Sequence, residues 1–459
     1  MNKERVADIA VIGAGTAGLS AFHEINAQGA EVLLIDRGPL GTTCARVGCM
    51  PSKAALHAGE QWATVHRLDT DHALSQADLA QHLWHQARST RDKLARGAAE
   101  RTVKAAGDRL IMGEAKFLDP ETLQVDGVRV RARAFVIATG SHPVVPKALE
   151  HLGDRLLTTD TLFELDALPQ SIGIIGMGAI GLEMGLALSR LGVRVIGGDL
   201  QTTLAGIADP AILKRALEIF SPELTLWLGQ PVDAHIESGG NGVRIESDGR
   251  INTVDRVLAA LGRQPNVKEL DLARAGVELD DHGRPALDLK TLRAAGSGAV
   301  FFAGDVNPDR PLMHEAADEG VNAARSALAA IDRNAKPVQP RRTPISIVFS
   351  NPDIASVGRP FAKIDRAEVV IGEAEGSANG RSKILHAETS LVRVYVEKAT
   401  HKILGAGLIA VQGEHLAHHL AWAVQRGDTV DDLLAMPYYH PSVEELLQSA
   451  FKDASRQLT

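Results

Sequence analysis

Two stretches of the chain share one pattern of apolar and polar positions. Each begins with a short apolar run, passes through the spacing G-x-G-x-x-G, continues with apolar residues at helical spacing, and closes on a second apolar run that ends in aspartate. The stretches are residues 8–36 and residues 171–199, and they match at a constant offset. This pattern predicts a buried parallel strand, a helix and a second strand, formed twice in one chain.

The glycines of this repeat have separate physical roles. In such a unit the first permits a tight turn, the second lets the backbone approach a pyrophosphate, and the third lets helix and strand pack closely. The helix N-terminus offers N–H groups to the phosphates, and the final carboxylate accepts hydrogen bonds from ribose hydroxyls. The positions are Gly13, Gly15, Gly18 and Asp36 in the first unit and Gly176, Gly178, Gly181 and Asp199 in the second. One such motif is weak support, but two in matching frames predict an α/β protein with two Rossmann-like domains that bind two adenine dinucleotides.

Asp199 bears on which nucleotide the second unit takes. A carboxylate at this place favours a free ribose 2′-hydroxyl and repels a 2′-phosphate. Residues 199–213 contain no Arg or Lys that would pair with a phosphate. We therefore expect NAD rather than NADP, although Gly197 and Gly198 would loosen the strand end and allow its register to shift.

The rest of the chain also divides by its pattern. We expect helices over residues 55–105, short strands joined by turns over 109–141, and another apolar strand at 299–306. After a proline-rich segment at 336–344, alternating strands and helices indicate a separate α+β domain. The expected domains are 1–145 and 146–268 for the two dinucleotide units, 269–340 for a central domain, and 341–459 for the last.

Composition narrows the class of protein. A chain of 459 residues is too long for one core and should form about three or four units. With 45% hydrophobic and 23% charged residues it is typical of a globular protein, and a net charge of −8 without a basic block argues against nucleic acid or anionic lipid as a partner. Glycines break the N-terminal apolar run and no stop-transfer segment follows, so we expect no membrane association and a cytoplasmic location.

The sequence "GTTCARVGCMPSK", residues 41–53, contains both cysteines of the chain, Cys44 and Cys49. A disulfide across so short a loop would stabilise the fold by only about 2 kcal/mol, and a reducing cytosol would open it. A metal site would need more ligands than this pair offers. Redox chemistry remains, with Gly48 helping the loop to curl and Pro51 at a first helical position, so that Cys49 stands at a helix N-terminus where its thiolate is favoured.

The order of the motifs along the chain resembles a known family. The first dinucleotide motif is followed by C-x-x-x-x-C, by "ATG" at 138–140, by the second dinucleotide motif, by "GRQPN" at 262–266, by "AGD" at 303–305 and by "HPSVEE" at 440–445. This order is similar to that of the flavin-dependent pyridine nucleotide–disulfide oxidoreductases, and within them to the dihydrolipoamide dehydrogenases. The resemblance covers essentially the whole chain. It implies a glutathione reductase-like FAD/NAD(P) fold in which the central domain completes the FAD site and the last domain, of α+β type, is a dimerisation domain.

The resemblance assigns both cofactors to particular residues. FAD would be held by Gly13, Gly15, Gly18, Asp36, Thr43, Lys53, Ala115, Thr139, Gly140 and Asp305. NAD would be held by Gly176, Gly178, Gly181 and Asp199, and Gly262 of "GRQPN" would add a further cofactor contact. No metal is implied.

The resemblance also implies catalytic roles. Cys49 would lie against the flavin as the charge-transfer thiol, and Cys44 would exchange with the substrate. Lys53 and Glu183 would form an ion pair beside the flavin ring. His440, held by Glu445 and followed by a helix starting at Pro441, would be the base that serves Cys44 across a homodimer with a shared active site.

A histidine-rich segment at 413–425 has a second interpretation. Glu414, His415, His418 and His419 have spacings that would put metal ligands on one helix face, but no matching cluster completes a coordination sphere. In the resembling family this segment is an interface helix, so we expect a dimer contact there.

The expected activity is oxidation of a dihydrolipoyl-type dithiol, free or carried on a lipoyl protein, with NAD. The alternatives are an NAD(P)H-dependent disulfide reductase of the glutathione reductase type and a non-catalytic flavoprotein redox sensor. Mercuric reductases and large thioredoxin reductases use extra C-terminal cysteines, which the tail "FKDASRQLT" lacks. Two departures from the family bear on the substrate, since "CARVGC" replaces the commoner "CLNVGC" and "YYHP" replaces "HAHP".

Overall fold

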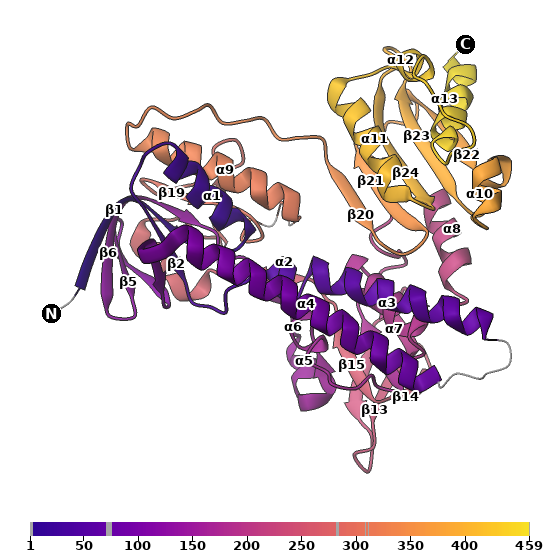
Figure 1. The fold of residues 1–459 in the computed structure, drawn as a ribbon, viewed down its shortest axis with the longest axis horizontal. Coiled ribbons are helices and arrows are strands. Elements are labelled where there is room, and N and C mark those ends of the chain that lie inside the picture. The colour runs from indigo at the N-terminus through magenta and orange to yellow at the C-terminus, as the bar shows by residue number, and fades with distance from the viewer. Residues whose placement is uncertain (1–2, 70–75, 281–283, 308, 311, 459) are drawn as a thin grey trace.

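The computed structural model describes residues 3–69, 76–280, 284–307, 309–310 and 312–458. Its strands form three main sheets with smaller ribbons between them. Figure 1 shows the C-terminal sheet and its helices set apart from the sheet that contains the N-terminus, with two long helices crossing the middle of the molecule. Within the described residues, no helix combines the length and apolar character that a membrane crossing requires.

The first sheet has nine strands, ordered β17-β18-β19-β6-β1-β2-β3, and β5 pairs with both β6 and β4. Its strands are β1 (Lys3–Ile12), β2 (Val32–Asp36), β3 (Leu110–Met112), β4 (Ala115–Asp119), β5 (Thr122–Val125), β6 (Val128–Ile137), β17 (Leu287–Asp288), β18 (Arg293–Ala294) and β19 (Val300–Phe302). β1 runs parallel to both β2 and β6, and helices α1 (Thr16–Ala27) and α9 (Met313–Ala330) pack together beside it. The expected central domain therefore gives its strands to the first sheet and has no sheet of its own.

β6 shows how the pattern of side chains suits its two environments. Its first half alternates exposed arginines with buried Val130, Ala132 and Ala134, as a strand with one solvated face does. Its last four residues are all buried, because Ala134 and Val136 pack into the core formed with α1 and α9 on one face, and Phe135 and Ile137 pack into the core on the other face. The strands expected over 109–141 are thus confirmed.

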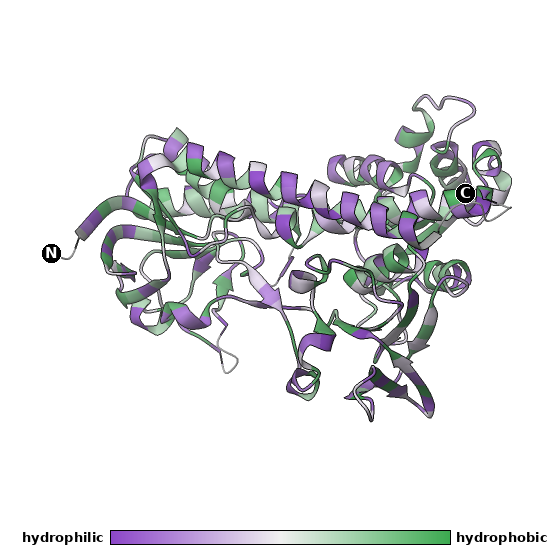
Figure 2. Cartoon of the chain, turned by 60° about the horizontal axis from the view of Figure 1, so that its bottom comes forward, coloured by the Kyte–Doolittle hydropathy of each residue, from purple (hydrophilic) through white to green (hydrophobic). Residues whose placement is uncertain are grey.

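Helices α2 (Thr43–Arg46), α3 (Cys49–Leu68) and α4 (Gln76–Ala106) follow the first βαβ unit, which confirms the helical prediction over the described part of 55–105. α4 is the long helix in Figure 2, and its outward residues are mostly hydrophilic. Trp84 on α4 is 0% exposed, and its Nε1 donates to the carbonyl of Leu165 at 2.9 Å. α3 lies close to α7 (Ala179–Arg190), where a Cβ on Gly59 would stand 2.9 Å from the carbonyl oxygen of Ala187. This close approach brings α3, which begins at Cys49, against the unit that contains the second glycine motif.

The second sheet has five parallel strands in the order β11-β10-β9-β15-β8. Its strands are β8 (Leu156–Leu157), β9 (Ser171–Ile175), β10 (Arg194–Asp199), β11 (Thr225–Leu228) and β15 (Arg256–Ala259); the accompanying helices are α5 (Lys147–Glu150), α6 (Thr159–Leu162), α7 and α8 (Pro210–Phe220). An antiparallel sheet of β12 (Asp233–Ile236), β13 (Val243–Ser247) and β14 (Arg250–Val254) extends it, and β7 (Ser141–Pro143) pairs with β16 (Arg263–Pro265).

The expected slip at Gly197 and Gly198 is wrong: β10 keeps one register against β9 and β11. The two glycines make room instead, since Cβ atoms there would meet the Met177 sulfur at 2.4 Å and the Val232 Cγ2 at 2.3 Å.

The C-terminal sheet is antiparallel, in the order β20-β21-β24-β23-β22. Its strands are β20 (Ile345–Val348), β21 (Asp353–Gly358), β22 (Val369–Glu375), β23 (Leu391–Glu397) and β24 (Ile403–Ala410); its helices are α10 (Gly380–Ile384), α11 (Gly413–Arg426), α12 (Val430–Leu434) and α13 (Glu445–Leu458). α11 and α13 pack on this sheet and bury Leu416, Leu420 and Phe451. The α+β prediction for this part of the chain is confirmed, while the four domain boundaries stay a prediction.

A buried polar cluster fastens the C-terminal sheet to α8. Asp209 caps that helix by accepting from the N–H of Ala211 at 3.0 Å, and Pro210 is the first helical residue, which suits its fixed φ. The Tyr395 hydroxyl of β23 donates to the same carboxylate at 2.8 Å, and Arg393 lies 3.3 Å away. Burial is the main cause that raises the pKa of Tyr395, so this hydroxyl keeps its proton and remains a donor.

Candidate redox and dinucleotide site

The two glycine motifs fold in the same way. In each, the first glycine has a φ that other residues rarely adopt, +104° at Gly13 and +99° at Gly176. The middle glycine precedes the helix in an extended conformation, with φ of −74° at Gly15 and −65° at Gly178. The duplicated sequence pattern thus gives duplicated geometry.

The space around these glycines fits two dinucleotides. A Cβ on Gly18 would stand 1.8 Å from the Gly13 carbonyl oxygen, and one on Gly181 would stand 1.9 Å from that of Gly176, so the third glycine allows the helix to touch the turn. By contrast, no described residue other than the adjacent ones has an atom within 4 Å of the Cβ positions of Gly15 and Gly178. Open space therefore meets the N-termini of α1 and α7, as a bound pyrophosphate needs.

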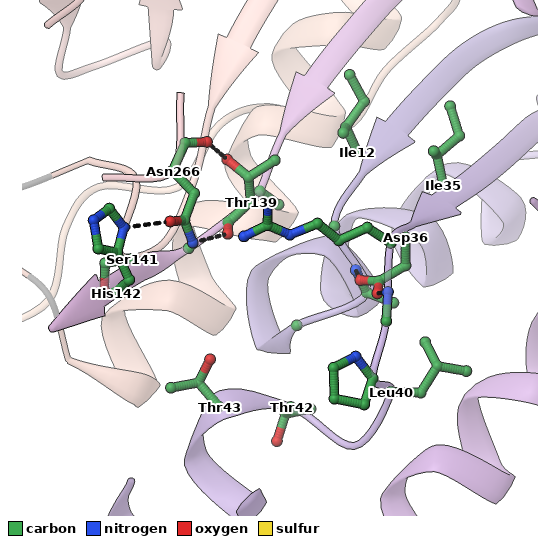
Figure 3. A pocket seen from close by; sticks show the side chains of 18 of the residues that line it. Ile12, Ile35, Asp36, Leu40, Thr42, Thr43, Thr139, Ser141, His142 and Asn266 are labelled. Atoms are coloured by element: carbon green, nitrogen blue, oxygen red, sulfur yellow. Dashed lines mark hydrogen bonds between the residues drawn. The ribbon is translucent and has the colours of Figure 1, made fainter. Parts of the chain in front are cut away.

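A cavity of about 310 Å³ opens beside the first motif. Figure 3 shows Asp36 and Ile35 on one side of it, Thr139, Ser141, His142 and Asn266 on the other, and Thr42 and Thr43 below. Of the residues expected to hold FAD, those that line the cavity are Gly13, Gly15, Asp36, Thr43, Ala115, Thr139 and Gly140. Gly18 lies beneath Gly13, and Asp305 lies behind Ser141, whose hydroxyl donates to it at 3.2 Å. Lys53, which was also expected to hold FAD, does not line this cavity. The structure therefore brings the expected FAD residues other than Lys53 together around one space.

Asp36 and Asp199 occupy equivalent places and make equivalent contacts. Each carboxylate accepts from the backbone N–H between the first two glycines, Asp36 from Ala14 and Asp199 from Met177, both at 2.6 Å. The other oxygen accepts from the N–H two residues further on, at 2.6 Å in Gly38 and 2.8 Å in Gln201. Each oxygen thus has one backbone partner and keeps a lone pair that can accept from a ribose hydroxyl. The short aspartate arm also braces the glycine turn, a role that the motif pattern does not reveal.

Asn266 and Arg263 also line the cavity, and the sequence argument did not assign them a role. Asn266, the last residue of "GRQPN", donates from Nδ2 to the Thr139 carbonyl at 2.9 Å and accepts from Thr139 Oγ1 at its own carbonyl at 2.7 Å. Arg263 donates to the hydroxyl and the carbonyl of Ser141 at 2.9 and 2.7 Å. Gly262, with a φ of +94°, turns the chain into the β16 ribbon, where its carbonyl accepts from the N–H of Val144 at 3.0 Å. The motif "GRQPN" was the available signal for these residues in the sequence. The contacts themselves depend on the pairing of β16 with β7, which joins segments far apart in the chain.

Glu319 on α9 was also missed. It is buried, and its carboxylate accepts from the Gly304 N–H at 2.9 Å and from the Asn307 side chain at 3.0 Å, while Arg341 pairs with it. Burial is the main cause that raises its pKa, to about 6, against the opposing effects of these donors. Glu319 therefore braces the turn that carries Asp305.

Cys44 lies on α2 and Cys49 is the first residue of α3. The two sulfurs are free thiols; Cys44 is partly buried and Cys49 is exposed. Gly48 lies between the helices, and a Cβ on it would stand 3.2 Å from the Cα of Cys44, so a side chain there would hinder the curl of the loop. The position expected for Pro51 is wrong. The helix begins at Cys49, two residues before the proline. This is possible because the first N–H groups of a helix have no partner within the helix, so the proline ring is accepted at any position of the first turn.

The two thiols differ in their affinity for a proton. A hydrogen bond from the Cys44 thiol is the main cause that lowers the pKa of Cys49 to about 6, and the Lys53 ammonium acts in the same direction against burial and Glu183. The same hydrogen bond, together with burial, raises the pKa of Cys44 above its ordinary value. In the reduced pair, Cys49 is thus the thiolate and Cys44 the thiol.

Lys53 and Glu183 form an ion pair between α3 and α7. The Lys53 Nζ lies 2.8 Å from both carboxylate oxygens, and the Glu183 side chain is only 6% exposed. Lys53 is one helical turn from Cys49 and so places its charge beside the thiolate. The structure therefore joins these two residues as the family resemblance implied.

His440 and Glu445 also lie together. The Nδ1 atom of His440 is 3.0 and 3.2 Å from the two carboxylate oxygens, and the Ser442 N–H donates to the same group at 3.0 Å. The bond from Ser442 is the first cause that lowers the pKa of Glu445, followed by His440. The helix expected from Pro441 begins instead at Glu445, since the intervening residues turn back so that Ser442 can cap the carboxylate. The His440 side chain is 77% exposed. Among the described contacts, none joins it to Cys44 of its own chain.

The histidines of α11 are exposed, on the side of the helix away from its buried leucines. His418 Nδ1 is 2.7 Å from the Glu414 carbonyl, and the rings of His418 and His419 lie 6.3 and 5.6 Å from that of Trp422. Among the residues that the structure describes, no group of three or more His, Cys, Asp or Glu side chains is arranged to hold a metal ion.

Comparison with known proteins gives this arrangement a family. The model of the pyridine nucleotide–disulphide oxidoreductases matches residues 7–320, and the model of the dimerisation domain of the same family matches residues 345–451. The chain belongs to this family. Pyridine nucleotide–disulphide oxidoreductases bind FAD and NAD(P), so this chain is a flavoprotein that uses both cofactors. The dimerisation domain indicates a homodimer.

Relatives of this oxidoreductase span several activities. It is 31% identical over 443 residues to a mercuric reductase of Staphylococcus aureus, covering 94% of this chain and 79% of the relative. It is 27% identical over 460 residues to a dihydrolipoyl dehydrogenase of Geobacillus stearothermophilus, covering 96% and 94%. Among solved structures, LpdA of Mycobacterium tuberculosis matches with a TM-score of 0.82 at 24% identity, covering 100% of both chains. The Cu(II) complex of the HOCl-induced flavoprotein disulfide reductase RclA of Escherichia coli matches with a TM-score of 0.83 at 21% identity, covering 98% and 99%. These structural likenesses show a shared fold.

Proposed function

We propose that this flavoprotein oxidises a dihydrolipoyl-type dithiol and passes the electrons to NAD⁺. The observation that carries the proposal is the unequal thiol pair, in which Cys49 has a lowered pKa beside Lys53 and Cys44 a raised one. A dithiol–disulfide exchange needs this asymmetry, because one sulfur must leave as a stable thiolate while the other exchanges with the substrate. The relatives named dihydrolipoyl dehydrogenase, matched over nearly their whole length, support the choice of dithiol.

The overall reaction converts a dithiol and NAD⁺ to a disulfide, NADH and one proton. In the oxidised enzyme a substrate thiolate attacks Cys44 Sγ, the bond between Cys44 and Cys49 breaks, and Cys49 leaves as a thiolate. The second substrate thiolate then attacks the sulfur bound to Cys44, which completes the substrate disulfide and leaves Cys44 to take a proton. FAD, when bound, supplies the two-electron carrier between this pair and the nicotinamide.

The other residues of the site manage charge and protons. Lys53, held by Glu183 through two contacts of 2.8 Å, keeps a fixed positive charge near Cys49 in either redox state. His440 is proposed to take the proton of the substrate thiol, and Glu445 fixes which ring nitrogen is free to do so. Because His440 is exposed on the dimerisation domain, we propose that it acts on substrate bound next to Cys44 of the other subunit.

NAD is proposed over NADP on the basis of Asp199. Its carboxylate is fixed at the end of β10 by the N–H groups of Met177 and Gln201, so a negative charge stands where a 2′-phosphate would have to bind. The loop that follows, 199–213, offers no cation to offset it. The cofactor-binding roles of the expected residues, including Gly176, Gly178 and Gly181, belong to this proposal.

A second candidate is a mercuric-type reductase, favoured by the 31% identity to the Staphylococcus aureus enzyme. Against it stands the cysteine count, since Cys44 and Cys49 are the only two thiols that the 459 residues could offer to a metal ion. A reductase of the glutathione type is disfavoured by Asp199.

The deciding experiment compares turnover of purified holoprotein with dihydrolipoamide and NAD⁺, with glutathione disulfide and NADPH, and with Hg²⁺ and NADPH. We expect turnover with the first pair; activity confined to either of the others overturns the proposal. The matched control is Cys44→Ser, which should lose dithiol turnover and keep reduction of its flavin by NADH. The proposed location is the cytoplasm, to be checked by cell fractionation.

A further inference from the structure

Phe349 connects the dimerisation domain to the redox centre of its own chain. It follows β20 directly, and its ring centroid lies 4.6 Å from the Lys53 Nζ. Its backbone N–H donates to the Glu183 Oε1 at 3.1 Å. One residue of the C-terminal domain thus contacts both members of the ion pair beside Cys49.

The segment that carries Phe349 is held firmly against α7. Arg190, at the end of that helix, is buried and donates to the carbonyls of Ser350 at 2.7 Å and Asn351 at 3.1 Å. Arg190 also pairs with Glu223 at 2.8 Å, and Ser350 is 0% exposed. Since α7 carries Glu183 as well, the ring and the carboxylate are fixed to the same helix and keep their positions relative to Lys53.

The ammonium of Lys53 is therefore held between a carboxylate and an aromatic face. The face of an aromatic ring is electron-rich and attracts a cation at this distance. The ring also covers part of the ammonium from water, and the Lys53 side chain is 32% exposed. A charge in less contact with water acts more strongly on its neighbours. Without the ring, Lys53 would gain freedom to move into solvent and its effect on Cys49 would weaken.

We propose that Phe349 is a positioning residue that holds the Lys53 ammonium beside Cys49 and so sets how readily Cys49 exists as a thiolate. The inference rests on the roles assigned above to Cys49 and Lys53, but it requires no particular substrate. The side chains that act on the Cys49 sulfur include Cys44, Lys53 and Glu183, and the Phe349 ring contacts the Lys53 ammonium. The dimerisation domain thereby acts on the redox pair of its own subunit, in addition to presenting His440 to the other.

The test measures the pKa of Cys49 through its rate of alkylation by iodoacetamide as a function of pH, in holoprotein with a Cys44→Ser background so that one thiol remains. Phe349→Leu removes the aromatic face but keeps an apolar side chain and the N–H bond to Glu183. We expect its Cys49 pKa to lie about 0.5 to 1 above that of the background protein. Phe349→Tyr keeps the face and should restore the background value. A merely structural role would not distinguish tyrosine from leucine in this way.

Two controls make the result decisive. Phe361→Leu removes a ring that lies 4.5 Å from the Arg366 guanidinium, far along the chain from the redox pair, and should leave the pKa of Cys49 unchanged. In a Lys53→Met background, Phe349→Leu should have no further effect, because the ring acts through the ammonium. An unchanged pKa in Phe349→Leu, or an equal shift with and without Lys53, overturns the proposal. Phe349→Met, which fits the same space without a π face, gives the same readout if the leucine variant folds poorly. Absence of dithiol turnover would count against the proposed function alone, since alkylation requires no substrate.

Discussion

Alanine substitutions at two glycines of the second motif should separate nucleotide binding from fold stability. At Gly181, inside α7, the new Cβ would stand 1.9 Å from the Gly176 carbonyl oxygen, well inside van der Waals contact, so helix and turn must move apart. Such overpacking costs about 1–3 kcal/mol, offset by about 1 kcal/mol of improved helix propensity. Because the clash is with backbone, the cost lies in the upper part of this range. We expect a net loss of about 1–2 kcal/mol, which lowers the melting temperature of a domain of this size by several degrees.

Gly178→Ala should behave in the opposite way. Apart from its two neighbours in the chain, no residue that the structure describes comes within 4 Å of its Cβ position, and its φ of −65° is open to alanine. Stability should therefore change by less than about 0.5 kcal/mol. The methyl group would stand at the N-terminus of α7, where the pyrophosphate approaches the backbone. Loss of one charge-assisted hydrogen bond there costs about 1.5–3 kcal/mol, or roughly 10- to 150-fold in the affinity for NAD.

Thermal unfolding followed by circular dichroism and the KM for NAD distinguish the two variants. The matched control is Gly298→Ala, which also has nothing within 4 Å of its Cβ position but lies outside both motifs. It should change neither quantity. The reasoning is refuted if Gly178→Ala binds NAD as tightly as the wild type, or if Gly181→Ala unfolds at the wild-type temperature.

Three other predictions follow from contacts already described. Cys44→Ala removes the hydrogen bond that is the main cause of the lowered pKa of Cys49, so this pKa should rise from about 6 toward its ordinary value. Alkylation of Cys49 should slow only below about pH 6 in the wild type and should already slow at higher pH in the variant; a pH profile that does not move contradicts the assignment. Tyr395→Phe deprives buried Asp209 of a donor at 2.8 Å and should destabilise the protein by about 1–2 kcal/mol in urea unfolding, whereas no change in the midpoint would show that the contact contributes nothing. His440→Gln should lower kcat for dithiol oxidation by about 10²–10⁴-fold while NADH still reduces the flavin at the wild-type rate; equal loss in both half-reactions would place His440 elsewhere in the mechanism.

The sequence predicted the dinucleotide units well because their chemistry is local. Gly13 and Gly18 are close in the chain, and the contacts that require glycine at both positions arise within one turn and one helix. The ion pair of Lys53 with Glu183 is different, because the two residues lie on separate helices and only the family resemblance connected them. No local pattern marks Phe349 or Glu319, whose roles come entirely from what the fold packs against them.

The two helix starts placed at prolines failed for a related reason. Proline has no backbone N–H, so it is accepted wherever that N–H would have no hydrogen-bond partner. This holds at several positions of the first turn of a helix and also outside a helix. Before Pro51 the chain already has helical geometry from Cys49, and after Pro441 the carboxylate of Glu445 draws the chain into a turn before the helix begins. Proline thus restricts where a helix begins without fixing the residue.

The pairing of β6 with β19 has a consequence for how the chain folds during synthesis. β6 ends at Ile137 and β19 begins at Val300, and the whole five-stranded parallel sheet lies between them in the sequence. That inserted sheet is complete once β15 has left the ribosome at Ala259, while residues 135–137 of β6 still lack their partner strand on the edge where β5 pairs only with residues 128–131. The part of the chain with the first glycine motif, although its sequence begins first, must therefore wait with part of β6 unpaired until the part with the second motif has been made. Its completion depends on closing a long loop around an already folded insert.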